Sequence, residues 1–145
     1  MDMQKMIIGS TRAGLTLKKE IINYLEKKGY QVKDVGMKED GESEKKFERG
    51  IIICGTGAGS VITAAKFKGV YPVHVTNTFM AEKASAVNNC NALVFGEWLT
   101  PPQHAFQMID AWLNTNFTDG NTEEWAAFLR NCVDEIGEIE NELFK

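Results

Sequence analysis

The sequence predicts an α/β protein with a five-stranded, mostly parallel sheet and a C-terminal helix. Short apolar runs alternate with segments that carry apolar residues at helical spacing, which is typical of strands joined by crossover helices. A glycine-rich turn follows one of these runs directly. The 145 residues have the length of one domain, which we place at 1–145, and 43% hydrophobic residues suffice for an ordinary core.

The pattern of the first half of the chain predicts a strand, a helix and two further strands. Residues 6–9 form a short buried strand, and residues 15–28 carry apolar side chains on one helical face until Gly29 ends the helix. Residues 31–35 form the second strand. The third strand, at 51–54, is apolar throughout, which predicts burial on both faces of the sheet.

The connection between the second and third strands is unusually short for a parallel crossover. Residues 37–49, MKEDGESEKKFER, are polar and must alone carry the chain across. A parallel crossover usually takes about a dozen or more residues and contains a helix. Either the two strands are joined by an unusually short connection without a helix, or a helix has been lost from the sequence at this point.

The second half repeats the alternation and ends in two helices. Pro101 and Pro102 suit the first turn of a helix, where a backbone N–H needs no helical partner. The last helix carries Trp125, Phe128 and other apolar residues at helical spacing, which we interpret as packing or dimer contacts. We expect strands at 70–75 and 92–95, and helices from the glycine turn to 67 and at 79–87, 101–113 and 122–144.

Composition excludes several classes of partner. A net charge of −4 and a pI near 5.2 argue against nucleic acid and an acidic membrane surface, because both select basic faces. Three cysteines without a CxxC spacing favour free thiols in a reducing cytoplasm, and we find neither a signal peptide nor a membrane span. His74 and His104 share no ligand motif, so we expect no metal. We also expect no organic cofactor. We interpret His74 as structural and His104 as a surface or packing residue.

The strongest local signal lies at 51–60, IIICGTGAGS, a buried strand that runs into a glycine turn and a helix. Such a turn directs successive backbone N–H groups at one point, and the helix dipole adds partial positive charge there. Ligands of open α/β sheets bind at these carboxyl ends of strands. The pKa of the Cys54 thiol should therefore fall below its usual value of about 8.5 and make a thiolate base available.

Two commoner uses of a glycine-rich turn do not fit the spacing. A dinucleotide site needs GxGxxG, but the third glycine falls at Ser60 when counted from Gly55 and at Ile62 when counted from Gly57. A P-loop needs a lysine and a hydroxyl residue after the glycines, and neither is present. The residues alone leave one alternative open, that Cys54 is a small buried hydrophobe like many free cysteines.

Four segments carry a resemblance to a known family. They are IIGSTRAGLTLKKEI at 7–21, ICGTGAG at 53–59, NNCNALVFGEW at 88–98 and MIDAWLNTNF at 108–117. In this order, over most of the chain, they resemble the ribose-5-phosphate isomerase B and galactose-6-phosphate isomerase family, and CGTGxG is fairly specific to it. The resemblance implies a Rossmann-like three-layer sandwich. It also implies a homodimer or a tetramer, with the final helix and the sites at the subunit interface.

The resemblance also assigns roles to residues. In that family the cysteine of CGTG moves a proton between C1 and C2 through an enediolate, which the neighbouring amides hold. Carried over, the catalytic residues are Cys54 as the base and Thr56 as a hydroxyl donor. Asn88 matches the asparagine of the family's His-Asn pair. Substrate contacts are implied for Ser10, Thr11, Arg12, Gly55, Gly57, Ala58, Gly59 and Asn88.

The sequence departs from the family where the family holds phosphate. The segment 11–14 reads TRAG in place of Asp-His-Ala-Gly, Val87 replaces the ring-opening histidine, and Trp98 replaces an arginine. The basic signature before the last helix is replaced by DGNTEEW at 119–125, whose glutamates would repel a phosphate dianion. Arg12 remains, and its planar fork suits a carboxylate as well as a phosphate.

The sequence therefore predicts an aldose–ketose isomerase that works by cysteine-mediated proton transfer on an unphosphorylated sugar or a keto-deoxy-uronate. One alternative is a sugar-phosphate isomerase of the ribose-5-phosphate or galactose-6-phosphate type, with basic residues recruited from elsewhere. Another is a catalytically weak paralogue that serves as a subunit of a hetero-oligomer or binds a sugar. The intact CGTGAG turn favours activity, whereas the missing histidine favours the last alternative.

Overall fold

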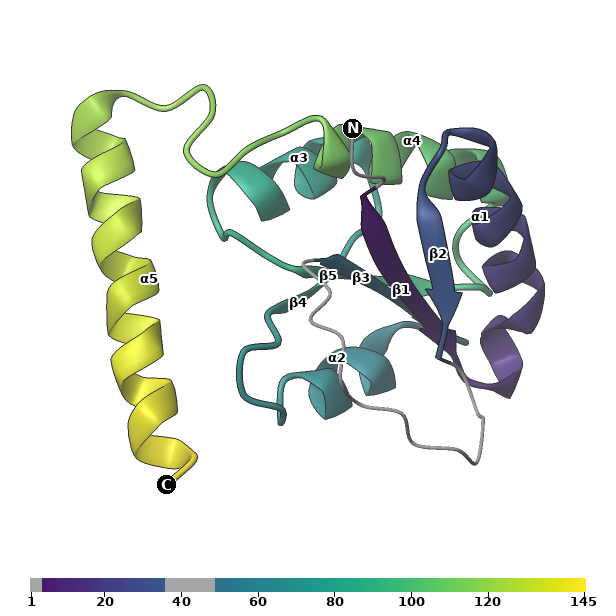
Figure 1. Ribbon diagram of the computed structural model, residues 1–145, viewed down its shortest axis with the longest axis horizontal. Helices are drawn as coiled ribbons and strands as arrows, with labels where there is room; N and C mark the ends of the chain where they lie inside the picture. The colour runs from purple at the N-terminus through teal and green to yellow at the C-terminus, as the bar shows by residue number, and fades with distance from the viewer. Residues whose placement is uncertain (1–3, 36–48) are drawn as a thin grey trace.

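The protein is built on one five-stranded sheet, in the order β2-β1-β3-β5-β4 (Figure 1). The computed structural model describes residues 4–35 and 49–145. Every neighbouring pair of strands is parallel, so the predicted α/β fold is confirmed. The strands are β1 (Lys5–Ser10), β2 (Gln31–Asp34), β3 (Arg49–Cys54), β4 (Pro72–His74) and β5 (Ala92–Gly96).

Helices lie on both faces of the sheet. The main core is formed between the sheet and three helices, α1, α3 and α4, while α2 lies on the opposite face (Figure 1). A short 3-10 helix, η1 (Arg12–Gly14), leads from β1 into α1. The helices are α1 (Leu15–Lys27), α2 (Ala58–Ala64), α3 (Thr78–Ala86), α4 (Pro102–Leu113) and α5 (Glu123–Leu143).

Two elements are shorter than their sequence patterns predict. Helix α2 ends at Ala64 rather than at 67, because tighter hydrogen bonds from Lys66 to Thr63 and from Phe67 to Ala64 close the turn after it. Strand β4 begins only at Pro72, because the Tyr71 N–H bonds to the side chain of Asn91 instead of to a strand.

The third strand is buried on one face only, contrary to its wholly apolar sequence. Ile51 and Ile53 are fully buried against the main core, whereas Ile52 and Cys54 on the other face are half-buried. On that face α2 is the only helix within the described parts of the chain, so the sheet is partly open there. The short connection predicted at 37–49 lies outside the described residues, apart from Arg49, which begins β3.

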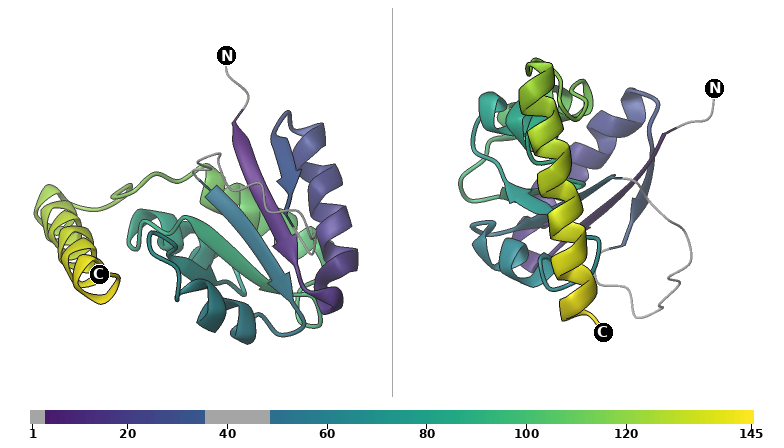
Figure 2. Two further views of the ribbon diagram at one scale, coloured as in Figure 1. Left: turned by 60° about the horizontal axis from the view of Figure 1, so that its bottom comes forward. Right: turned by 90° about the vertical axis from the view of Figure 1, so that its left-hand side faces the viewer.

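Helix α5 stands away from the sheet, at the end of a loop that follows α4 (Figure 2). Only Ala126 and Leu129 of its 21 residues are buried. Its far end is tied to the segment before β4, where the Glu140 carboxylate accepts hydrogen bonds from the Gly69 N–H at 2.5 Å and the Tyr71 hydroxyl at 2.9 Å. None of the helices in the described ranges is long and apolar enough to cross a membrane.

Candidate active site

Cys54 is the last residue of β3, at the carboxyl edge of the sheet, and the chain turns directly from it into α2. Gly57 in this turn has a φ of 87°, a left-handed conformation that glycine enters without strain. This conformation directs the Gly57 N–H back onto the thiol, with 3.1 Å between the nitrogen and Cys54 Sγ. The glycine turn therefore supplies a hydrogen-bond donor to the cysteine, as its sequence predicts.

The pKa of the Cys54 thiol lies below its ordinary value. Partial burial of the sulfur acts to raise it, but hydrogen bonds from the Ser60 hydroxyl and from the backbone N–H groups of Ser60, Gly57 and Thr56 outweigh the burial. All of these donors are neutral, so hydrogen bonding rather than a charged neighbour stabilises the thiolate. A larger share of Cys54 is therefore in the form that accepts a proton at neutral pH.

Ser60 lowers the pKa of the Cys54 thiol, and sequence reasoning missed it. Position 60 is where a dinucleotide site would need glycine, yet here the Ser60 hydroxyl bonds the Cys54 sulfur. The residue is 8% exposed and lies in the first turn of α2. First-turn side chains of a helix lie near the same point as its free N–H groups, and this helical position is the signal that could have identified Ser60.

Aromatic rings pack closely against the turn on two sides. A Cβ on Gly55 would lie 2.9 Å from carbons of the Trp98 indole, and a Cβ on Gly57 would lie 2.7 Å from the His74 imidazole. Real Cβ atoms do not approach other atoms this closely, so glycine at both positions is what allows the rings to touch the turn. The turn that holds Cys54 is thus confined between β4 and the segment after β5.

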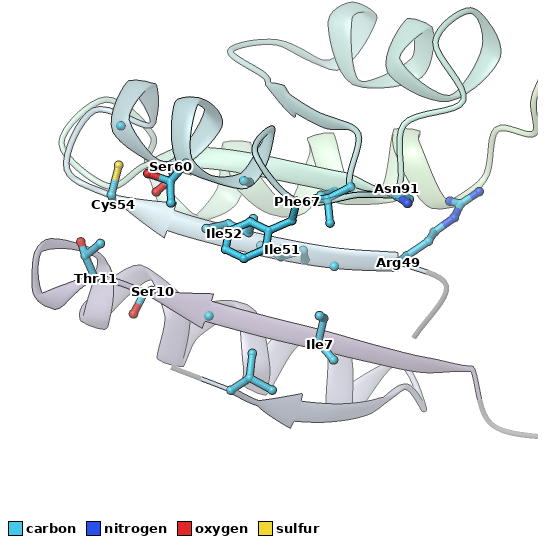
Figure 3. A pocket seen from close by; sticks show the side chains of 18 of the residues that line it. Ile7, Ser10, Thr11, Arg49, Ile51, Ile52, Cys54, Ser60, Phe67 and Asn91 are labelled. Carbon is cyan, nitrogen blue, oxygen red and sulfur yellow. The ribbon is translucent and has the colours of Figure 1, made fainter. Parts of the chain in front are cut away.

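A groove of about 750 Å³ begins at Cys54 and runs over the open face of β1 and β3 (Figure 3). Cys54, Thr11 and Ser60 lie at one end of the groove, and Arg49 and Asn91 lie at the other (Figure 3). The wall between the two ends includes the apolar residues Ile7, Ile52, Ala64, Phe67 and Val70. We take the end that holds the cysteine as the candidate active site.

The loop after β1 lies directly beside the cysteine. The Thr11 N–H donates to the carbonyl of Ile53 at 2.9 Å, and Ser10 and Thr11 line the same groove as Cys54. Arg12 is exposed and forms no ion pair with any residue in the described ranges. The structure thus brings the predicted Ser10 and Thr11 to the cysteine and leaves the neighbouring guanidinium available to an anion. The predicted Gly59 also lines this groove.

Asn88 lies at the opposite end of the sheet from Cys54. It precedes β5, whereas Cys54 pairs with Gly96 at the end of that strand. The loop before α5 is also at that opposite end, because the Asn121 amide donates to the carbonyl of Ala86 at 3.4 Å. One copy of the chain therefore does not bring Asn88 to Cys54.

The two histidines occupy different environments. His74 ends β4 and touches the cysteine turn, and its buried Nε2 has no hydrogen-bond partner within the part of the chain that the structure describes. His104 is exposed on α4. Within residues 4–35 and 49–145, no three histidine, cysteine, aspartate or glutamate side chains gather in a way that could hold a metal ion.

Comparisons with known proteins agree with one another. The sequence pattern of the family described as Ribose/Galactose Isomerase matches residues 6–127. The chain is 37% identical to the 4-deoxy-4-sulfo-D-erythrose isomerase of Clostridium sp. (strain MSTE9), over 97% of this chain and 98% of that protein. It is 31% identical to the D-erythrulose-4-phosphate isomerase of Pectobacterium atrosepticum, over 83% of this chain and 89% of that protein. The solved ribose-5-phosphate isomerase B of Clostridium thermocellum superposes with a TM-score of 0.81 at 34% identity, covering 96% of this chain and 99% of that one.

Proposed function

Because the chain belongs to the ribose/galactose isomerase family, we propose that it interconverts the aldose and ketose forms of a short sugar whose terminal anion carries one negative charge. Membership of this family makes the chain an aldose–ketose sugar isomerase. The proton carrier that we propose is Cys54, and the anion that we propose is a sulfonate rather than a phosphate.

The observation that carries the proposal is the hydrogen-bonded thiol of Cys54 at the end of a groove. Its sulfur accepts from the Gly57 N–H at 3.1 Å and from the Ser60 hydroxyl, and these bonds favour the thiolate. A base for this reaction must be ionised near neutral pH and must reach the substrate. Hydrogen bonds lower the pKa of Cys54, and the half-buried residue lines the groove, which supports both requirements.

The reaction needs one base and a set of donors for a developing negative charge. The Cys54 thiolate removes the proton from C2 of the open-chain aldose, and the electron pair moves onto the C1 carbonyl oxygen to give an enediolate. N–H groups of the turn stabilise this oxygen. The proton on the C2 oxygen then passes to the C1 oxygen, with the exposed Thr56 hydroxyl as its carrier. Cys54 returns its proton to C1, and the C2 oxygen becomes the ketose carbonyl.

The side of the site that would hold phosphate is built differently in this chain. Trp98 stands in place of the family's arginine, and Thr122 is engaged in capping α5, where its hydroxyl accepts from the Trp125 N–H at 3.3 Å. Arg12, beside the cysteine loop, is a cation without an ion pair to any described residue. A phosphate carries close to two negative charges at neutral pH, whereas a sulfonate carries one. The relative that is named as a sulfo-sugar isomerase supports this choice of anion.

We further propose that two copies of the chain share the site, in the cytoplasm. Asn88 lies too far along the sheet to reach Cys54 in its own copy, so a second copy is needed if both residues contact one substrate. Helix α5 supports this assembly, because Phe128 is 51% exposed and Ile139 is 56% exposed on a helix with few buried residues. Three free cysteines agree with a reducing compartment.

A substrate comparison tests the proposal. We expect kcat/KM for 4-deoxy-4-sulfo-erythrose to exceed kcat/KM for erythrose 4-phosphate and ribose 5-phosphate by about tenfold to several hundredfold, since one guanidinium cannot balance a dianion. Arg12→Ala should lower kcat/KM for the sulfonate. Cys54→Ala should lower kcat by about a hundredfold or more without unfolding, as expected for a lost general base, while Cys132→Ala serves as the control.

The other outcomes identify the competing functions. Efficient turnover of a phosphate sugar, unaffected by Arg12→Ala, would restore the sugar-phosphate interpretation. Preferred turnover of a keto-deoxy-uronate would agree with a terminal anion of one negative charge, but would identify that anion as a carboxylate instead of a sulfonate. Binding of a sugar without turnover would identify a sugar-binding paralogue, and full activity of Cys54→Ala would remove the cysteine from the mechanism.

A further inference from the structure

His74 lies behind the cysteine turn, at the end of β4. The strand register pairs His74 with Val94, and Val94 with Ile52, so these side chains share the face of the sheet that carries Cys54. A Cβ on Gly57 would lie 2.7 Å from both Nε2 and Cδ2 of the imidazole and 3.2 Å from Cε1. The ring edge centred on Nε2 therefore faces Gly57, whose N–H holds the Cys54 sulfur.

Packing alone does not explain an imidazole in this position. Nε2 is buried and has no hydrogen-bond partner among residues 4–35 and 49–145. A buried polar atom without a partner costs about 1–3 kcal/mol, and a phenyl ring of similar shape would fill the space without that cost. The polar edge of the ring is directed at a turn where negative charge collects, first on the thiolate and then on the enediolate. Oriented dipoles at such a place stabilise the charge that forms.

Resting on the proposed role of Cys54, we propose that His74 is a positioning residue of the catalytic turn. In the tautomer with hydrogen on Nε2, the N–H dipole of the ring favours negative charge on the turn whose Gly57 N–H points at the Cys54 sulfur, and a phenyl ring lacks this dipole. The groups that face the sulfur from α2 and its turn are the neutral donors of Ser60, Gly57 and Thr56, and His74 is the titratable side chain that packs against that turn from β4.

The test measures the thiol itself and needs no substrate. Alkylation of Cys54 by iodoacetamide is followed against pH by mass spectrometry, so that Cys90 and Cys132 are resolved separately. In His74→Phe the midpoint of the alkylation curve should move to higher pH by about half a unit to one unit, which lowers the thiolate fraction at neutral pH by about threefold to tenfold. The kcat value should fall by a similar factor, with KM within about twofold.

Two further variants make the result decisive. His104→Phe changes the other, exposed histidine and should match the wild type in both readouts. His74→Gln returns an N–H near the place of Nε2 and should recover part of the shift. An unshifted alkylation curve in folded His74→Phe, or a folded His74→Gln that resembles His74→Phe, would overturn the inference. A Cys54→Ala variant that still isomerises sugar would instead overturn the proposed mechanism, and the alkylation result would remain valid.

Discussion

The indole ring of Trp98 lies against the α-carbon of Gly55, the residue that follows Cys54. A Cβ on Gly55 would lie 2.9 Å from Cε2 and Cζ2 of the ring. The backbone N–H of Trp98 donates to the Gly55 carbonyl at 3.0 Å. The side chain is still 72% exposed, so its other face is open to solvent beside the site. Trp98 therefore packs against the turn, and we propose that it also occupies the place where the family carries a cation.

Replacing this ring by a cation should change the preferred anion. In Trp98→Arg we expect kcat/KM for erythrose 4-phosphate to rise by about tenfold, because a second guanidinium can balance the second phosphate charge. Trp98→Ala, which removes the ring without adding charge, is the matched control. If both variants treat phosphate substrates alike, charge at position 98 does not set the choice of anion.

The hydrogen bond from Ser60 should appear in the pH profile. Because the pKa of Cys54 is lowered in the folded protein, activity should hold as pH falls to that pKa and decline below it, as the thiolate is protonated. Ser60→Ala removes a donor to the thiolate, so the acid limb of kcat/KM should move to higher pH. The rate at neutral pH should then fall about threefold to tenfold and recover in alkaline buffer. Ser60→Thr keeps a hydroxyl and should retain most of the wild-type profile; a constant loss at all pH values in Ser60→Ala would mean damage to the turn instead.

The backbone conformation of Gly57 should make it intolerant of a side chain. Gly57→Ala places a methyl group in the left-handed region and against His74, which should cost about 1–3 kcal/mol and lower the melting temperature by about 2–10 °C. Gly59 lies in α2, and a Cβ there meets no atom within 4 Å, so Gly59→Ala should leave the melting temperature unchanged or higher. Calorimetry of the two variants checks the contrast, and equal melting temperatures would contradict it.

Helix α5 should hold two copies of the chain together. Sedimentation at micromolar concentration should give about twice the 16.2 kDa chain mass. Phe128→Glu and Ile139→Glu place charges on the exposed apolar side of α5 and should yield monomers with little activity, since the proposed site needs both copies. Glu138→Gln, a neutral change on the same helix, is the control. A fully active monomer would contradict both the dimer and the shared site.

Local sequence patterns were sufficient for the fold and for the position of the cysteine. The strand that ends at Cys54 and the turn around Gly57 depend on residues adjacent in the sequence, where apolar runs and glycine conformation are informative. The same holds for Pro102, which opens α4 as its sequence position predicts. The family resemblance extended this local pattern to most of the chain.

The remaining features depend on contacts between distant parts of the chain. Three isoleucines before Cys54 predict burial on both faces, but burial also depends on which helices cover the sheet, and Ile52 is left half-buried. The contact of His74 with Gly57 arises from the strand order, which no short pattern encodes. The position of Asn88 relative to Cys54 is a property of the sheet as a whole, and the joint role that we propose for them depends on a second copy.

The attachment of the last turns of α5 has a practical consequence for fusion proteins. Glu140 holds Gly69 and Tyr71 immediately before β4, and β4 ends at His74 behind the cysteine turn. A reporter protein or purification tag fused after Lys145 would therefore lie a few residues from this junction, where disturbing the Glu140 contacts would disturb the strand that backs the turn. Tags and reporters belong at Met1, so that kinetic constants measured on a fused enzyme describe the enzyme itself.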